Sequence, residues 1–372
     1  MTVTEETLAG LRRLRVDGER RAAFRAIGAA AAEEIHAVLA GLGEGEQLRR
    51  FAGSEAGAAA VDRVLTATRR WHGTELDEAY ALAEGAGVDP HLLLLANLRR
   101  DLGGHDGLGC SDLALTGPHA LLAHNEDGGP ALEDRLVLLS LALDGEVPVT
   151  VLWYPGFVPS NTFVANGNGL VWGINHIQVA TPADAPGRHF VARGLQRTGG
   201  IDEAVGYLAA HPSAGGFTYN IGELGTGRTV SVETAAGAHT AVEADGLAWH
   251  TNHLRYLDEP PAVSGATGAE LLGGRDNSLA RARVLEALRI PAQGTESAWA
   301  LEILGVRPVP DGVYRSALDG DPLLTLCTFV AELRTGEITV RPRGRQAVTV
   351  PFETFVPGAG RARSSRGRYR TR

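Results

Sequence analysis

The sequence contains no lysine, because all 35 basic residues among its 372 residues are arginine. It therefore has no amine side chain for a Schiff base and no lysine for a phosphate-binding P-loop or a kinase site. The patterns G-x-x-x-x-G-K-[ST] and G-x-S-x-G are also absent. These absences exclude Schiff-base enzymes, P-loop nucleotide hydrolases, kinases and hydrolases built on a serine elbow.

Cysteine is scarce too, with only Cys110 and Cys327, which excludes a disulfide framework and a cysteine-rich metal site. The longest apolar runs, residues 92–95 and 136–143, are far shorter than the roughly 20 residues that cross a bilayer. Residues 1–6 are acidic and lack the apolar segment of a secretory signal. We therefore expect a cytoplasmic protein with no membrane partner.

The last twelve residues, 361–372, contain six arginines and no acid, so the rest of the chain carries a net charge of −15 (−9 minus +6). Such a segment is found in nucleic-acid-binding arms and also as a disordered, solvated end. The body is acidic and Tyr369 is the tail's one aromatic residue, so we favour a disordered tail and no nucleic-acid partner.

Residues 1–101 are expected to be helical. Good helix formers fill residues 22–42, and residues 74–85 begin with threonine, carry acids in the first turn and end at glycine. Asp89 followed by Pro90 predicts the start of a further helix over 91–101. Four glycines in residues 102–109 then form a linker.

After residue 109 the pattern changes to short apolar segments separated by Gly, Pro and Asp, which is typical of strands. Helices are expected at residues 202–210, 277–288 and 296–304, and a hairpin turn at 222–227. The predicted strands are residues 110–115, 120–124, 136–143, 149–154, 169–175, 217–221, 229–233, 247–250, 325–333 and 337–341. Helices set between groups of strands favour a layered α+β architecture over a parallel βαβ repeat.

Cys110 lies at the junction of the helical and the strand-rich regions. It is either a nucleophile or a small apolar residue at a strand start, whereas Cys327 has the surroundings of a core residue. Cleavage of the Gly109–Cys110 bond would give Cys110 a free α-amine, whose reference pKa of about 7.7–8.0 suits a general base. Such a nucleophile would need no separate histidine.

Short motifs follow one another in a defined order along the chain. They are Asn97-Leu-Arg99-Arg-Asp, Gly109-Cys110-Ser111, His124-Asn125-Glu126-Asp127, Tyr154-Pro155-Gly156, Gly173-Ile-Asn175, His250-Thr251-Asn252-His253 and Ser278-Leu-Ala-Arg281. This order resembles the acyl-coenzyme A:6-aminopenicillanic acid acyltransferase family of autoproteolytic N-terminal-nucleophile (Ntn) hydrolases over residues 20–350. The chain is similar, more distantly, to bile salt hydrolases and penicillin V acylases, and within the family to the carcinine and β-alanyl-amine hydrolase branch.

The resemblance implies an αββα four-layer sandwich with an N-terminal helical segment. It also implies a precursor that cuts itself between Gly109 and Cys110. The α fragment would then be residues 1–109 and the catalytic β fragment residues 110–360, followed by the tail.

The resemblance further implies a role for each matching residue. Cys110 is the N-terminal nucleophile, and Asp127 binds its new α-amine. Asn252 and Asn175 donate N–H groups to the developing oxyanion, and Arg281 supports the site electrostatically. Without the resemblance, Asp127 would be a turn residue and the two asparagines a loop cap and a strand end. For Asn175 and Arg281 the structural and catalytic interpretations stay open.

A substrate pocket lined by His124, Glu126, Tyr154 and His253 is also expected. The family often has an aromatic residue or an arginine near the acid, and here His124 and Glu126 are its neighbours, which leaves the substrate open. A two-residue shift would put Arg283 in the place of Arg281. A zinc site at His250, His253, His119 and His124 lacks a recognisable ligand spacing, so we expect no metal.

We therefore expect an amidohydrolase or acyltransferase that acts without a cofactor on a small acyl- or aminoacyl-amine. The reaction would pass through a thioester at Cys110, which water or an acceptor amine resolves. The alternative is an inactive, unprocessed protein that keeps the fold for binding. Association into a homo-oligomer is open.

Overall fold

The computed structural model describes residues 1–43, 45–102, 109–160, 162–179, 181–258, 269–318 and 321–359, with the backbone alone for 269–274. The arginine-rich tail and residues 103–108 of the glycine-rich segment lie outside these ranges. Within them, no helix is both long enough and apolar enough to cross a membrane.

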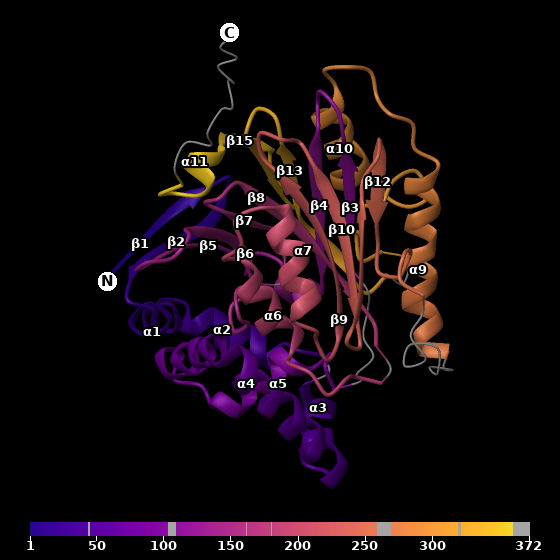
Figure 1. Cartoon of the computed structure of the whole chain (residues 1–372). Coiled ribbons are helices and arrows are strands. Elements are labelled where there is room, and N and C mark those ends of the chain that lie inside the picture. Colours follow the sequence, from indigo (N-terminus) through magenta and orange to yellow (C-terminus); the bar gives the residue numbers. More distant parts are fainter. Residues whose placement is uncertain are drawn as a thin grey trace, which may run out of the picture.

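The described chain forms two stacked β-sheets between two layers of helices, so the αββα arrangement expected from the sequence is confirmed (Figure 1). The nine-stranded sheet has the order β1-β2-β5-β6-β7-β8-β9-β10-β11, and the six-stranded sheet the order β12-β3-β4-β13-β14-β15. Strands β3 and β4 of the smaller sheet face β8 and β9 of the larger one. Apart from the parallel pair β2–β5, the strand pairs of the described residues are antiparallel.

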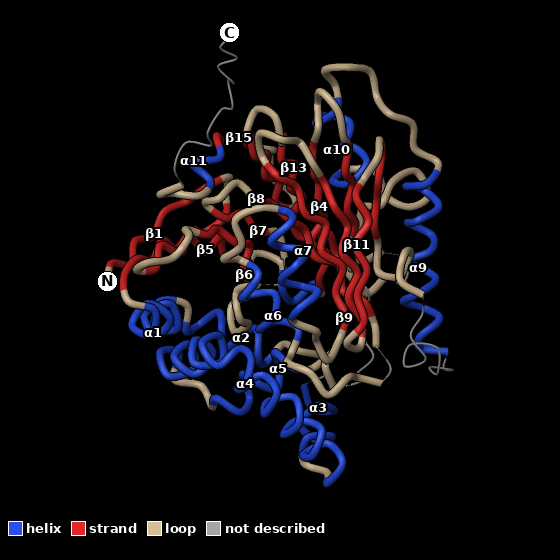
Figure 2. The backbone as a smooth tube through the Cα atoms, viewed as in Figure 1, coloured by secondary structure: helices blue, strands red, loops and turns tan. Residues whose placement is uncertain are grey.

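The strands of the larger sheet are β1 (Thr2–Leu8), β2 (Leu11–Gly18), β5 (Val137–Leu143), β6 (Val149–Trp153), β7 (Val164–Asn166), β8 (Leu170–Ile177), β9 (Gly216–Glu223), β10 (Thr229–Ala235) and β11 (Ala238–Glu243). Those of the smaller sheet are β3 (Ser111–Leu115), β4 (Leu121–Gly128), β12 (Leu247–His250), β13 (Leu324–Glu332), β14 (Glu337–Pro342) and β15 (Val348–Pro351). Figure 2 shows these strands gathered between the helices.

One helical layer covers the outer face of the larger sheet. It contains α1 (Arg20–Ala30), α2 (Ala32–Ala40), α3 (Gly45–Ala52), α4 (Glu55–Ala86), α5 (Pro90–Leu98), α6 (Arg188–Leu195) and α7 (Ile201–Ala210). The other layer, α9 (Ala269–Glu286) and α10 (Glu296–Gly305), packs on the smaller sheet. The short α11 (Phe352–Phe355) follows β15, and a 3-10 turn, Pro130–Leu132, follows β4.

The expectation that residues 1–101 are helical is wrong for the first eighteen. Strands β1 and β2 form a hairpin, and β2 pairs with β5. Strand β1 lies at the sheet edge with mostly exposed polar residues, so it lacks the apolar alternation that identifies a half-buried strand. The N-terminal region therefore contributes strands to the same sheet as the C-terminal region.

Two helix boundaries also differ from the expectation. The helix expected at 22–42 is broken at Ala31, and the one expected at 74–85 begins at Glu55, with Ser54 as its N-cap and a kink at His72. A Cβ at Gly28 would lie 2.2 Å from the Leu82 carbonyl oxygen. Glycine at this position therefore lets α1 and α4 cross closely.

Candidate active site

Cys110 stands immediately before β3 in a constrained backbone conformation. Its φ of 85° is in the region that residues other than glycine rarely adopt. The neighbouring Gly109 is packed so tightly that a Cβ there would lie 2.7 Å from the Asp127 backbone oxygen. The Gly109–Cys110 peptide is thus pressed against β4, with the Cys110 side chain almost fully buried.

Asp127 holds the backbone nitrogen of Cys110. The Cys110 N–H donates to Asp127 Oδ2 at 3.0 Å, and the Thr325 hydroxyl donates to Oδ1 at 2.7 Å. Burial raises the pKa of Asp127, while the positive charges of Arg315 and Arg281 oppose that rise. Thr325 comes from β13, and no sequence signal pointed to it.

Arg281 connects the Cys110 residue with Asn252. Its guanidinium donates to the Cys110 carbonyl oxygen, to Ser111 Oγ at 2.8 Å and to Asn252 Oδ1 at 2.7 Å. Burial lowers the pKa of Arg281 to about 10, so it remains a cation at neutral pH. Arg283 is exposed, and Arg281 is therefore the arginine of α9 that reaches the site.

The two asparagines expected near the oxyanion differ in what their amides do. Asn252 Nδ2 donates to the His176 carbonyl oxygen at 3.1 Å. Asn175 Oδ1 accepts from Asn220 at 2.8 Å, but its buried Nδ2 has no hydrogen-bond partner among the described residues. An unsatisfied buried amide donor is costly and therefore needs an explanation.

Asn175 lies on the same face of β8 as Gly173. A Cβ at Gly222, the partner of Val171, would touch Leu122, and one at Gly173 would touch His124. Residues two apart on a strand share a face, so Asn175 points to the same side of β8 as Gly173, toward the smaller sheet.

A buried cluster of ionisable groups lies beside the thiol; we call it the His124 cluster. His124 bonds Asp112 through Nδ1 at 3.0 Å and Glu126 through Nε2 at 3.1 Å, and the Tyr154 hydroxyl donates to Glu126 at 2.6 Å. Burial works against its charge, but the two carboxylates raise the pKa of His124 to about 10. His124 is therefore an imidazolium at neutral pH.

The thiol of Cys110 is kept protonated in this setting. Burial, together with the nearby charges of Glu126 and Asp127, raises the pKa of Cys110. The ligand atoms of Cys110, His124 and Glu126 lie within 4.8 Å of one another. Among the described residues, these are the three that could together contact a cation, although His124 and Glu126 already bond each other.

A cavity of about 420 Å³ opens at Cys110, which is a volume suited to a small molecule. Glu126, Asp127 and Tyr154 line it, as do Arg99, Arg100 and Arg188. His124 lies behind Glu126 rather than in the cavity wall. His253 does not reach this cavity and instead bonds Thr251 and Ser278.

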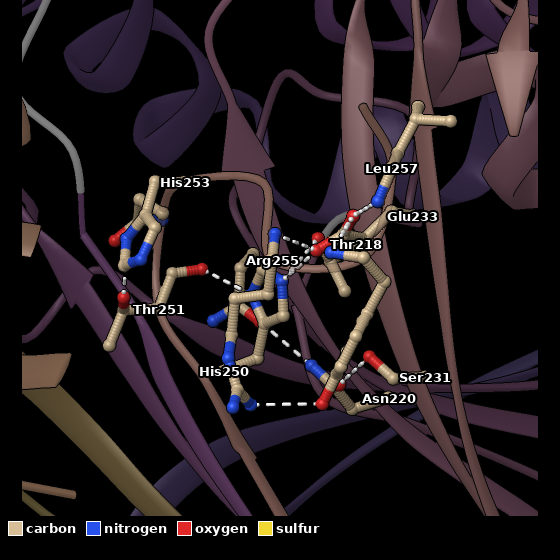
Figure 3. Close-up of polar contacts among 12 residues, drawn as sticks. Thr218, Asn220, Ser231, Glu233, His250, Thr251, His253, Arg255 and Leu257 are labelled. Atoms are coloured by element: carbon tan, nitrogen blue, oxygen red, sulfur yellow. Dashed lines mark hydrogen bonds and ion pairs between the residues drawn. The ribbon is translucent and has the colours of Figure 1, made fainter. Parts of the chain in front are cut away.

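A second buried histidine–carboxylate pair, which we call the Glu233 cluster, lies near β12 (Figure 3). His250 Nε2 lies 2.8 Å from Glu233 Oε1, and Glu233 also accepts backbone N–H groups of Arg255, Tyr256 and Leu257. Strand β12 ends at His250, so His253 lies beyond the strand.

A comparison with protein families found a match over part of the chain. The profile of the acyl-coenzyme A:6-aminopenicillanic acid acyltransferase family matches residues 115–283. This part of the chain is therefore similar to that family. No curated protein sequence matches it.

Solved structures of a hydrolase and an acylase are similar at low identity. A mutant conjugated bile acid hydrolase from Clostridium perfringens shares 11% identity, covering 66% of this chain and 93% of that one, with a TM-score of 0.38. Penicillin V acylase from Agrobacterium tumefaciens shares 12% identity, covering 65% of this chain and 86% of that one, with a TM-score of 0.39.

Proposed function

We propose that this protein is a self-processing amidohydrolase or acyltransferase whose nucleophile is the thiol of Cys110. The observation that carries the proposal is the placement of the Cys110 nitrogen on Asp127, at the wall of a cavity large enough for a small substrate. The match to the family's profile supports the same type of reaction.

Processing would begin at the intact Gly109–Cys110 peptide. The Cys110 thiol attacks the Gly109 carbonyl carbon, the C–N bond breaks, and the nitrogen takes up a proton to become the α-amine of Cys110. Water then hydrolyses the resulting thioester, which leaves a carboxylate on Gly109 and regenerates the thiol. The positive φ of Cys110 and the crowding at Gly109 favour a reaction that relieves this packing.

Catalysis would use the groups that processing leaves in place. The α-amine, still held by Asp127, takes the proton of the thiol, and the thiolate attacks the substrate amide carbon. Asn175 Nδ2, which has no other partner, and Asn252, which Arg281 orients, would donate to the oxyanion. The amine leaves with the proton, and a thioester remains at Cys110.

Water resolves the thioester in hydrolysis, and a second amine resolves it in acyl transfer. We propose hydrolysis of a small acyl- or aminoacyl-amine in the cytoplasm as the working function, without a cofactor. The α and β fragments, residues 1–109 and 110–360, would stay together because β1 and β2 pair within the larger sheet.

Intact-mass analysis of the purified chain tests the proposal. The wild-type protein should give two fragments that divide at Gly109–Cys110, and Cys110→Ala should give one intact chain. Cys327→Ala, a buried cysteine of β13, is the matched control and should process normally. A wild-type chain that stays intact, with Cys110 unreactive toward an acylating electrophile, would support the alternative of an inactive binding protein.

A further inference from the structure

A second cavity, of about 180 Å³, lies between the two sheets; we call it the inter-sheet cavity. Its walls are β3, β4 and β12 of the smaller sheet and β9, β10 and β11 of the larger sheet. A cavity of about 150 Å³ accommodates a molecule as large as benzene, so this volume suits a small ligand. Among the described residues, none lines both this cavity and the one at Cys110, so the two are separate.

The inter-sheet cavity has polar walls, although the space between two packed sheets is normally filled by apolar side chains. Asp112, Asn220, Thr229 and Ser231 all line it. The Ser231 hydroxyl donates to Asn220 Oδ1 at 2.7 Å, a contact visible in Figure 3. Because polar groups lose free energy in an apolar environment, such walls favour a polar occupant over an apolar one.

Two buried polar atoms of these walls have no hydrogen-bond partner within the described part of the chain. They are Asp112 Oδ2 and Thr229 Oγ1, on residues that are each 1% exposed. The other oxygen of Asp112 bonds His124 at 3.0 Å. An unpaired oxygen on a buried carboxylate is especially unfavourable, because the group is charged. The two atoms therefore point to a ligand that donates hydrogen bonds.

Asp112 is held in place by the strand behind it. A Cβ at Gly173 of β8 would overlap both Asp112 Oδ1 and His124 Nδ1, so the glycine lets this pair pack directly against the backbone of β8. The bond to His124 then fixes the carboxylate from one side. Oδ2 is the oxygen that remains for a ligand in the inter-sheet cavity.

Carboxylates outnumber cations in the walls of the inter-sheet cavity. Asp112, Glu243 and Asp245 line it, against Arg255 alone. Glu243 and Asp245 are exposed, and Glu243 also accepts from Arg228 at 2.8 Å. The excess of negative charge favours a cationic ligand over an anionic one.

The single arginine of these walls is engaged by aromatic residues. The guanidinium carbon of Arg255 lies 3.4 Å from the centre of the Trp249 ring and 4.9 Å from that of Tyr256. The same group donates to the Trp249 carbonyl oxygen and to the Tyr256 hydroxyl. Stacking and these two bonds hold the guanidinium at the wall, so Asp112 remains the charged group that a ligand can pair with.

We propose that the inter-sheet cavity is a second binding site, which takes a small primary amine whose ammonium group binds Asp112 Oδ2. An ammonium supplies three N–H donors and a charge that compensates the buried carboxylate. A hydroxyl group on the same molecule would bond Thr229. The inference concerns a site apart from the cavity at Cys110 and does not depend on the proposed function.

The His124 cluster separates the two cavities and connects them. Asp112, at one end of the cluster, lines the inter-sheet cavity, and Glu126, at the other end, lines the cavity at Cys110. His124 bonds both carboxylates. An amine on Asp112 would therefore meet the groups around the thiol from behind, without covering the thiol.

A matched pair of ligands tests the preference for an ammonium group. Isothermal titration calorimetry of the purified full-length protein compares 4-amino-1-butanol with 1,4-butanediol, in which a hydroxyl replaces the ammonium. We expect the Kd of the amine to be at least tenfold lower, because only the amine compensates the charge of Asp112. Equal affinity for the two compounds, or no detectable binding of the amine, overturns the inference.

Variants assign the binding to the inter-sheet cavity. Asp112→Asn removes the charge, and Ala248→Leu fills the cavity from β12, so each should raise the Kd of the amine at least tenfold. Asp77→Asn, an exposed acid of α4, is the matched control and should leave the Kd unchanged. Ala248 is only half-buried, which keeps the test decisive if Asp112→Asn fails to fold. An unchanged Kd in Ala248→Leu would contradict the site.

Alkylation of Cys110 distinguishes the two cavities, since Glu126 and Asp127 also present carboxylates to an amine. A saturating concentration of 4-amino-1-butanol should not slow the alkylation, followed by peptide mass spectrometry, because the amine leaves the thiol uncovered. Protection of Cys110 would place the amine in the cavity at the thiol and overturn the inference. Binding of the amine to a chain that stays unprocessed and inactive would uphold the second site and contradict the proposed function.

Discussion

The His124 cluster and the Glu233 cluster combine the same groups, a buried histidine and buried carboxylates, for different ends. The two oxygens of Glu233 bond His250 and accept three consecutive backbone N–H groups. Glu233 therefore holds the backbone that follows β12 in place. In the His124 cluster, Glu126 faces a cavity and lies within 4.8 Å of a thiol.

The difference lies in what each carboxylate can still influence. Hydrogen-bond donors surround Glu233 and compensate its negative charge locally. Burial raises the pKa of Glu233, but His250 opposes this and the pKa stays below the usual range. Glu126 shares His124 with Asp112, and its charge also acts on the Cys110 thiol. We infer that the first cluster stabilises the fold, whereas the second sets the electrostatics of the reactive sulfur.

The largest expected effect is on stability, from Glu233→Gln. A glutamine offers one oxygen where the carboxylate offers two, and its NH2 would face backbone donors. Leaving these buried groups unpaired should cost about 3–5 kcal/mol in the free energy of unfolding. Urea denaturation in a Cys110→Ala background, which should remain one chain, measures it.

A second measurement on Glu233→Gln is the rate of Cys110 alkylation as a function of pH, which we call the Cys110 alkylation profile. Its dependence on pH, followed by peptide mass spectrometry in the chain that keeps Cys110, should not move in Glu233→Gln. A shift there, or a stability close to that of the parent protein, would contradict the separation between the two clusters.

Glu126→Gln should change the pKa of Cys110 strongly and the stability of the fold only a little. Removal of a negative charge close to the thiol should lower the pKa of Cys110 by roughly 1 to 3 units, because one like charge no longer opposes the thiolate. Alkylation of Cys110 should then begin at lower pH than in the wild type. Stability should fall less than in Glu233→Gln, since glutamine keeps an oxygen for Tyr154. An unchanged profile would show that Glu126 does not act on the sulfur.

The pH dependence of stability tests His124 itself. Its folded pKa of about 10 is above its ordinary value of about 6.5, so its contribution is complete below pH 6.5 and is lost as pH rises toward 10. In the Cys110→Ala background, stability should therefore decline between pH 6.5 and 8.5, by at most about 1.4 kcal/mol per pH unit from this group. His124→Gln should flatten the decline, whereas exposed His91→Gln should not. The same slope in all three chains would contradict the assignment.

The sequence predicted most of the strands after residue 109, because buried apolar segments between turn residues leave a clear pattern, but it missed β7, β11 and β15. It did not predict α6, whose N-cap Gly187 makes no side-chain capping bond, so the usual signal for a helix start is missing. Arg188 and His189, which line the cavity at Cys110, were missed with it. Strand β1 was missed because an exposed edge strand needs no apolar face.

The candidate site could be named from motifs, but its contacts could not. Asp127, Arg281 and Asn252 are far apart in the sequence and meet at Cys110 only because β4, α9 and the end of β12 converge there. Thr325 and Asn220 orient these groups from other strands and carry no local pattern. In the sequence His250 belonged only to a zinc site that we did not expect, and its partner Glu233, 17 residues away on β10, carried no signal.

The smallest expected effects come from removing one hydroxyl from each cluster. Tyr154→Phe removes the donor 2.6 Å from Glu126, and Thr218→Val removes the hydroxyl 3.2 Å from His250 Nε2. Each should cost about 0.5–1.5 kcal/mol in the free energy of unfolding. Only Tyr154→Phe should also shift the Cys110 alkylation profile to lower pH, and by less than Glu126→Gln. The reason is that Glu126 without this hydrogen bond is more easily protonated, and a partly neutral Glu126 opposes the thiolate less. If Thr218→Val moved the profile as well, the two clusters would be coupled through the strands between them, and the Glu233 cluster would have to be counted as part of the site.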